Sequence, residues 1–168
     1  FLTNLKIIDT QHPIAKSIAF IPLNNNTKIN GYSTPNIFPL MKQDTCTIDY
    51  EVDEEMNLIC YNVKETISIN GLFGIAINVS DKVDYQPFNY GIYNIVLSVN
   101  DEILYSAQYN NIPFNDEHKY IIAERDYALK KLYDEKFIRL FVSDYINLPN
   151  FIESSKLSKL LLKKGSHK

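Results

Sequence analysis

The chain has 168 residues, enough for one domain that buries a hydrophobic core without help from disulfides or metals. Its net charge of −3 comes with no basic stripe, which excludes a phosphate-neutralising surface for nucleic acid. No apolar run approaches the ~20 residues that a membrane-spanning helix needs. Tyr and Phe are abundant, and these side chains favour strands because they fit a pleated, half-buried surface.

The chain is expected to divide into two parts. Residues 1–14 are predicted to be an extended lead-in or interdomain linker, and residues 15–168 a β domain. Aromatic and β-branched stretches bounded by turn residues predict short strands at 15–23, 37–41, 66–69, 73–79, 91–99, 103–105 and 137–142. Many short strands with frequent turn signals predict a mainly β fold, an immunoglobulin-like β-sandwich.

Two hairpins and one helical insertion are predicted. Alternating apolar residues on both sides of an acidic turn predict a hairpin over 45–61, and Asn100-Asp101 predicts a tight turn. Helical spacing in parts of 116–133 predicts one short helical segment there. Residues 154–164 are weakly helical, and their lysines are interpreted as a solvated helix face.

The core is expected to form mainly from the central strands. The residues predicted to contribute to it or to its rim are Ile75, Ile77, Val79, Ile95, Leu97, Val99, Leu104 and Tyr105. Gly74, inside the first of these strands, indicates a bulge or a close approach of other atoms to the backbone.

The two cysteines leave two interpretations open. If the first hairpin turns about Asp53, Cys46 falls opposite Cys60, and both sulfurs lie on one face. A cross-strand disulfide would then form in an oxidising compartment. Two separate buried thiols are the alternative, and this is the interpretation that we favour.

No catalytic, cofactor-binding or metal-binding residue is predicted. His12, His118 and His167 are isolated in the sequence and form none of the spacings typical of zinc sites. The acidic residues of 49–55 lack the glycine and terminal glutamate of an EF-hand loop, so a solvated turn is the preferred interpretation.

Aromatic residues cluster in the centre of the chain, at Tyr85, Phe88, Tyr90, Tyr93, Tyr105, Tyr109 and Phe114. Packing in the core and loops is the preferred interpretation, because alternation along strands turns about half of such side chains inwards. The alternative is an exposed set that anchors a partner or stacks on sugar rings. The candidate binding surface on that hypothesis consists of Tyr85, Phe88, Tyr90 and Tyr109.

Short motifs through most of the chain resemble a known domain. They are Phe73-Gly74-Ile75-Ala76-Ile77, Asp81, the run from Gly91 to Asn100, Ile103-Leu104-Tyr105-Ser106, Pro113-Phe114-Asn115-Asp116-Glu117, Tyr120-Ile121 and Asp126-Tyr127. This pattern resembles the β-sandwich region that follows the catalytic domain in certain bacterial lysostaphin/LytM-type zinc metallo-endopeptidases, exported enzymes that cut peptide cross-links of peptidoglycan. The run from Gly165 to Lys168 resembles the opening of a late strand, so the domain is expected to be truncated at its C-terminus.

The resemblance implies a role without catalysis in this chain. The family's two zinc-binding histidine motifs have no counterpart here, so zinc is expected only in a missing upstream domain, and whether the parent is an active enzyme stays open. The implied function is an accessory domain that positions a cell-envelope peptidoglycan peptidase, or binds wall or partner. Expected partners are the peptidase domain, envelope proteins or peptidoglycan, in the periplasm or envelope of a bacterium. The alternative is a stand-alone immunoglobulin-like interaction or adhesion module of an envelope complex.

Overall fold

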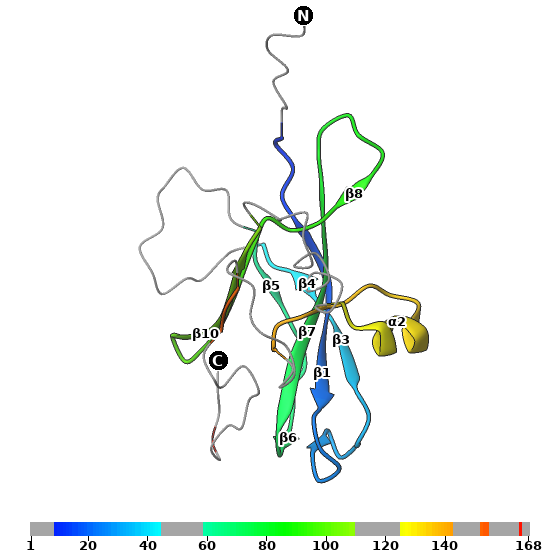
Figure 1. The fold of residues 1–168 in the computed structure, drawn as a ribbon, viewed down its shortest axis with the longest axis vertical. Helices are drawn as coiled ribbons and strands as arrows, with labels where there is room; N and C mark the ends of the chain where they lie inside the picture. Colours follow the sequence, from blue (N-terminus) through cyan, green and yellow to red (C-terminus); the bar gives the residue numbers. More distant parts are fainter. Residues whose placement is uncertain (1–8, 45–58, 110–124, 143–151, 155–164, 166–168) are drawn as a thin grey trace, which may run out of the picture.

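A computed structural model describes residues 9–44, 59–109, 125–142, 152–154 and 165. These residues form a mainly β structure of antiparallel sheets, which confirms the predicted fold class (Figure 1). The immunoglobulin-like part of that prediction remains a prediction. Within the described ranges, no helix is long and apolar enough to cross a membrane.

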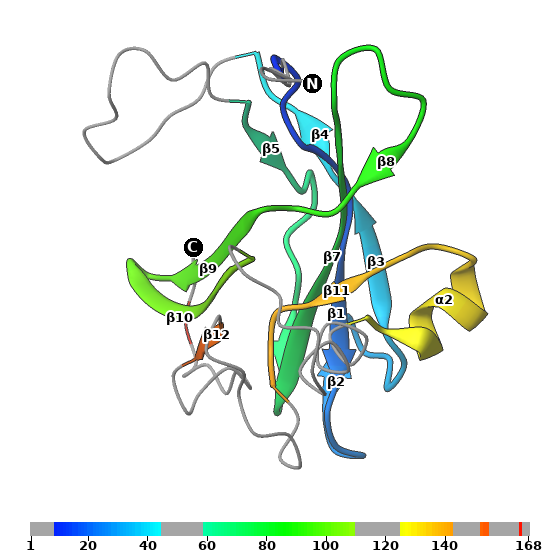
Figure 2. The same cartoon turned by 45° about the horizontal axis from the view of Figure 1, so that its top comes forward.

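The main sheet has the strand order β11-β7-β1-β3, and β8 pairs with the end of β7 (Figure 2). Its strands are β1 (Ile14–Pro22), β3 (Asn36–Pro39), β7 (Phe73–Lys82), β8 (Asn89–Tyr90) and β11 (Ile138–Arg139). The pairing of β1 with β7 runs from Ile14 opposite Ser80 to Pro22 opposite Phe73. In this order β3 lies at an edge, a position that suits Pro39 because proline has no backbone N–H to donate to a further strand.

A second sheet has the order β12-β10-β9, from β9 (Asn94–Val99), β10 (Glu102–Gln108) and β12 (Ile152–Ser154). Asn100 and Asp101 join β9 to β10 with φ values of 51° and 65°, which confirms the predicted tight hairpin turn. Two small ribbons complete the described strands: β2 (Lys28–Ile29) with β6 (Ile69–Asn70), and β4 (Met41–Lys42) with β5 (Tyr61–Asn62).

The larger core cluster joins the two sheets. Its buried residues are Phe73, Ile75, Leu104, Tyr105, Ala107 and Leu140. Four more of the predicted core residues are half-buried and pack against it: Ile77, Ile95, Leu97 and Val99. Seven of the eight predicted core residues therefore lie in or beside this cluster. Val79, the eighth, is half-buried outside it. In β7 and β9 the alternation that predicted these positions holds, because every second side chain of a strand projects from the same face. In β10 the adjacent Leu104 and Tyr105 are both buried in the cluster, at a point where the register with β9 shifts.

The opposite face of the main sheet is covered by the only helix in the described residues, α2 (Tyr127–Tyr133), and by the segment that follows it. Leu129 and Phe137 pack there against Ala19 and Ala76, whose small side chains let this layer approach closely. The carboxylate of Asp126 caps the helix by accepting a 2.9 Å hydrogen bond from the backbone N of Leu129. Of the predicted helical segment 116–133, residues 127–133 are confirmed as helix, whereas Arg125 and Asp126 precede it and residues 116–124 lie outside the described residues.

The favoured interpretation of the cysteines is wrong for Cys60, which is disulfide-bonded. The chain's one other cysteine, Cys46, lies outside the described residues, as does most of the predicted 45–61 hairpin. The predicted register is also wrong where it can be seen. The backbone N of Gln43 donates to the carbonyl of Cys60 at 2.7 Å, which places Gln43 opposite Cys60.

Candidate functional site

A two-stranded extension of β7 projects from the main sheet at the top of Figure 1. Asp81 and Lys82 pair with Tyr90 and Asn89 of β8, and residues 83–88 close the loop between them. We call residues 81–90 the arm. No strand was predicted over residues 81–90, because they show no alternating pattern that would indicate strand pairing.

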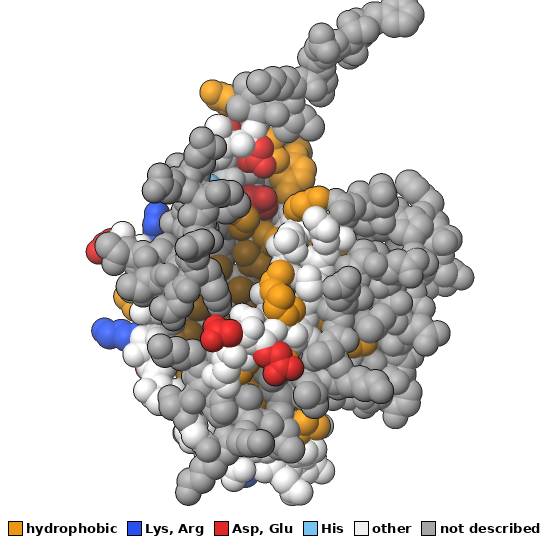
Figure 3. All heavy atoms as spheres, turned by 90° about the vertical axis from the view of Figure 1, so that its left-hand side faces the viewer, with side chains coloured by type: hydrophobic (Ala, Val, Ile, Leu, Met, Phe, Trp, Pro, Cys, Tyr) orange, Lys and Arg blue, Asp and Glu red, His pale blue; other side chains and the backbone are white. Residues whose placement is uncertain are grey.

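Three of the four candidate binding residues lie on the arm, and their side chains are exposed. Tyr85 is 96% exposed, Phe88 64% and Tyr90 42%. Hydrophobic side chains are visible at the upper end of the molecule in Figure 3. The preferred interpretation, that these three side chains pack in the core or loops, is therefore wrong. They form an exposed set, as in the alternative interpretation.

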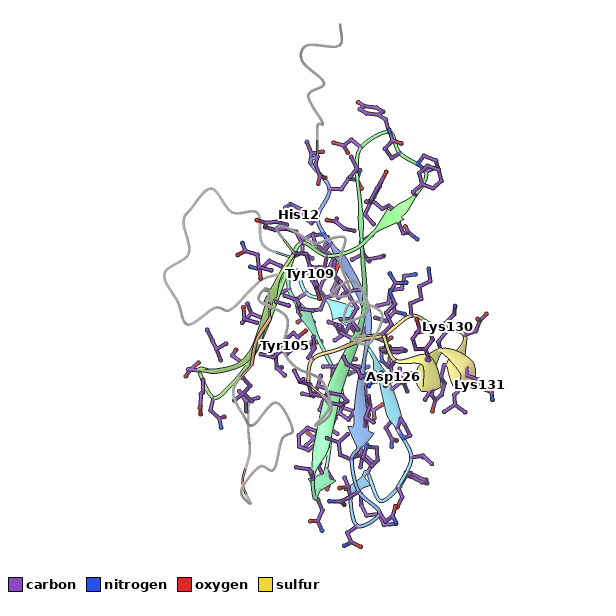
Figure 4. All side chains as sticks on the ribbon, in the orientation of Figure 1. His12, Tyr105, Tyr109, Asp126, Lys130 and Lys131 are labelled. Carbon is purple, nitrogen blue, oxygen red and sulfur yellow. The ribbon has the colours of Figure 1, made fainter. Side chains whose placement is uncertain are left out.

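Tyr109 does not belong to this group. It follows β10, is half-buried, and packs against the core cluster between the two sheets (Figure 4). Its backbone N donates a 2.9 Å hydrogen bond to the carbonyl of Tyr93, a residue that the sequence-based set of four omitted. Tyr93 is 56% exposed, and its hydroxyl accepts a 3.3 Å hydrogen bond from Gln108 Nε2.

The backbone at Tyr85 has a conformation that is unfavourable for a tyrosine. Its φ of 62° lies in the left-handed region, which costs an L-residue other than glycine, asparagine or aspartate roughly 1–2 kcal/mol. A ring that is 96% exposed recovers almost none of this free energy by packing within the chain. Backbone strain of this kind often marks a functional position.

The arm is fastened to the lead-in by one carboxylate, which we call the Asp84 latch. Asp84 accepts hydrogen bonds from the backbone N of Thr10 (3.0 Å), from Thr10 Oγ1 (2.7 Å) and from Gln11 Nε2 (2.9 Å). The hydrogen bond from the Gln11 side chain, followed by that from the Thr10 side chain, holds the pKa of Asp84 below its ordinary value of 3.8. The latch therefore fixes the arm beside residues 10 and 11 at neutral pH.

Within the described ranges, no group of three or more His, Cys, Asp or Glu side chains could hold a metal ion. His12 is exposed on the lead-in, and His118 and His167 lie outside the described residues. The charged group beside α2 has a structural role: Arg139 Nε lies 3.6 Å from Asp126 Oδ2, and Arg139 Nη2 donates to the carbonyl of Arg125 at 3.1 Å. These contacts hold the start of α2 against β11.

Comparison with known proteins identifies no relative of this chain. No family model, curated protein or solved structure matches this chain. The resemblance to peptidase-associated domains therefore remains an expectation from the sequence.

Proposed function

We propose that this chain is a non-catalytic binding domain that contacts a protein partner in the bacterial cell envelope through the aromatic arm. The observation that carries the proposal is Tyr85, an almost fully exposed ring on a left-handed backbone position. Tyrosine is among the residues enriched at the centres of protein interfaces. An interface that buries this ring would supply the stabilisation that the isolated chain does not provide.

The arm is suited to binding because its position is fixed before a partner arrives. Two backbone ladder positions join it to β7, and the Asp84 latch joins it to the lead-in. A surface that is already ordered loses less conformational entropy when it binds, so more of the contact energy contributes to affinity.

In the more specific form of the proposal, the chain is an accessory domain of a peptidoglycan metallo-endopeptidase and positions that enzyme. The support is the pattern of motifs between Phe73 and Tyr127, which lie in part on β7, β9 and β10 and include Asp81 of the arm. The alternative is a stand-alone interaction or adhesion module, and the exposed aromatic arm supports this as well.

Export is part of the proposal, and the disulfide at Cys60 supports it. Disulfides persist in the periplasm and outside the cell, whereas cytosolic thiols are kept reduced. We therefore propose that the domain works in the periplasm or on the cell surface.

The intact mass of the native protein, compared with its gene, separates the two forms of the proposal. A native chain that continues upstream into a domain with zinc-binding histidine motifs supports the accessory role. A native chain that begins near Phe1 contradicts it and leaves the stand-alone module. The chain purified alone should bind no stoichiometric zinc and hydrolyse no peptidoglycan, and zinc-dependent hydrolysis by this chain would contradict the proposal in both forms.

In a full-length peptidase, the arm can be tested by substitution. Tyr85→Asn should slow hydrolysis of the wall in living cells, where the partner protein is present, and leave hydrolysis of a short soluble peptide by the purified enzyme unchanged, because the arm positions the enzyme on its partner without touching the reacting bond. Tyr32 provides a matched control, since it is 65% exposed and lies beside β2, at the end of the main sheet opposite the arm (Figures 1 and 2). Equal effects of Tyr85→Asn and Tyr32→Asn would contradict a specific role of the arm.

A further inference from the structure

The arm and the described lead-in residues 9–14 together carry a net negative charge. Asp81 and Asp84 lie on the arm, Asp9 lies on the lead-in, and Lys82 is the one lysine or arginine between residues 81 and 90. In the described part of the chain, none of these three carboxylates forms an ion pair. The groups that donate to Asp84 are the backbone N of Thr10 and the neutral side chains of Thr10 and Gln11, so its negative charge is not compensated by a cation among its hydrogen-bond donors.

One carboxylate lies beside an exposed aromatic ring. Asp81 is directly opposite Tyr90 in the β7–β8 ladder. Opposite residues of an antiparallel pair project from the same face, with Cβ atoms about 4.5–5.5 Å apart. Lys82 and its partner Asn89 project from the other face, so the arm's own cation is turned away from this pair.

The Asp81 carboxylate also retains free acceptor capacity. Its Oδ1 accepts a 2.9 Å hydrogen bond from the backbone N of Lys82, and its other oxygen has no donor among the described residues. Asp84, by contrast, already accepts three hydrogen bonds from the lead-in and has little capacity left for a ligand. Asp81 is thus the carboxylate of the arm that can accept hydrogen bonds from a partner.

We infer that the arm binds a lysine or arginine side chain of its partner protein between the Asp81 carboxylate and the Tyr90 ring. A carboxylate forms strong, charge-assisted hydrogen bonds with such a cation, and the face of a tyrosine ring attracts it. Tyr85 and Phe88 contact apolar groups beside the cation. The inference rests on the proposed function. It narrows the partner to a protein with a basic segment, because the negative charges of Asp9, Asp81 and Asp84 would repel a polyanion.

A capped hexa-arginine peptide tests the inference on this chain, with amide chemical shifts as the readout. The expected result is a saturable set of shifts confined to residues 81–90 and the latched lead-in, absent with capped hexaglutamate. Asp81→Asn and Tyr90→Leu should each weaken the affinity about threefold or more. Amide spectra that are unchanged outside the arm show that each variant is folded.

Glu102→Gln is the matched control, because Glu102 is an exposed carboxylate at the β9–β10 turn. Equal weakening by Glu102→Gln and Asp81→Asn would mean diffuse attraction between opposite charges, and would overturn the inference. Shifts that are absent from the arm would overturn it as well. If a photo-cross-linker at position 85 nevertheless forms an adduct with an envelope protein, the proposed function stands without this inference. If neither the peptide-induced shifts nor this adduct is observed, the inference and the proposed function are both overturned.

Discussion

The ring of Phe141 covers Gly74 so closely that no side chain fits between them. A Cβ at position 74 would lie 2.5 Å from both Cδ1 and Cε1 of this ring. The backbone N of the preceding residue, Leu140, donates a 2.8 Å hydrogen bond to the carbonyl of Ile75, which places the segment after β11 alongside β7. The close approach predicted at Gly74 is thus confirmed, and β7 continues there in regular register with β1.

Gly74→Ala should destabilise the domain by about 1–3 kcal/mol, because the added methyl group forces the packed ring of Phe141 to move. The measurement is denaturant unfolding followed by fluorescence or circular dichroism. Gly91→Ala is the control: position 91 has nothing within 4 Å of an added Cβ, and its change should stay within about 0.5 kcal/mol. Equal stabilities of the two variants would contradict the packing described here.

Reduction of the disulfide at Cys60 should lower the free energy of unfolding by roughly 3 kcal/mol. The estimate applies to the loop of 15 residues from Cys46 to Cys60, these being the chain's two cysteines. Opening such a loop gives the unfolded chain more conformational entropy. Thermal unfolding with and without reductant measures the effect, and the double variant Cys46→Ser, Cys60→Ser should not respond to reductant. A wild-type midpoint that is insensitive to reductant would contradict the prediction.

Acid should open the Asp84 latch. The pKa of Asp84 is lowered by the Gln11 and Thr10 hydrogen bonds, so the latch is complete above the ordinary value of 3.8 and is lost as the pH falls through the lower folded value. The amide signal of Thr10 should therefore stay constant from neutral pH down to about 4 and shift below it. The same signal in Asp84→Asn should lack this transition, and a midpoint above 3.8 in the wild type would contradict the proposed donors.

Tyr85→Asn should unfold no more easily than the wild type. Asparagine tolerates the left-handed backbone better than tyrosine, and the ring it replaces is almost fully exposed. Denaturant unfolding measures the difference. A loss of more than about 1 kcal/mol would show that the Tyr85 ring packs within the chain, and would remove the argument that its role is binding.

The core was predictable because its pattern is local. Ile75 and Ile77, for example, lie two residues apart in one strand, and this spacing places both on the same face, towards the larger core cluster. The latch was not predictable, since it joins Thr10 to a carboxylate 74 residues away, and such a contact produces no periodic pattern in the sequence. The exposure of Tyr85 was equally hidden, because composition cannot distinguish an aromatic residue on a projecting loop from one in the core.

The sequence also could not establish the register before β5. A hairpin that turns about Asp53 would place Cys46 opposite Cys60, whereas the structure places Gln43 there, three residues earlier. Register depends on the geometry and length of the connecting turn, which single-residue preferences do not define.

Photo-cross-linking from the arm tests the proposed binding role most directly. A benzoylphenylalanine at position 85 of the native full-length protein, activated in its own cells, should form a discrete adduct with one envelope protein or with a neighbouring domain of the same chain, identified by mass spectrometry. The same group at position 32, which is exposed but away from the arm, should give at most a minor adduct. Equal yields from the two positions, no adduct from position 85, or an adduct to peptidoglycan alone would contradict a protein partner at the arm.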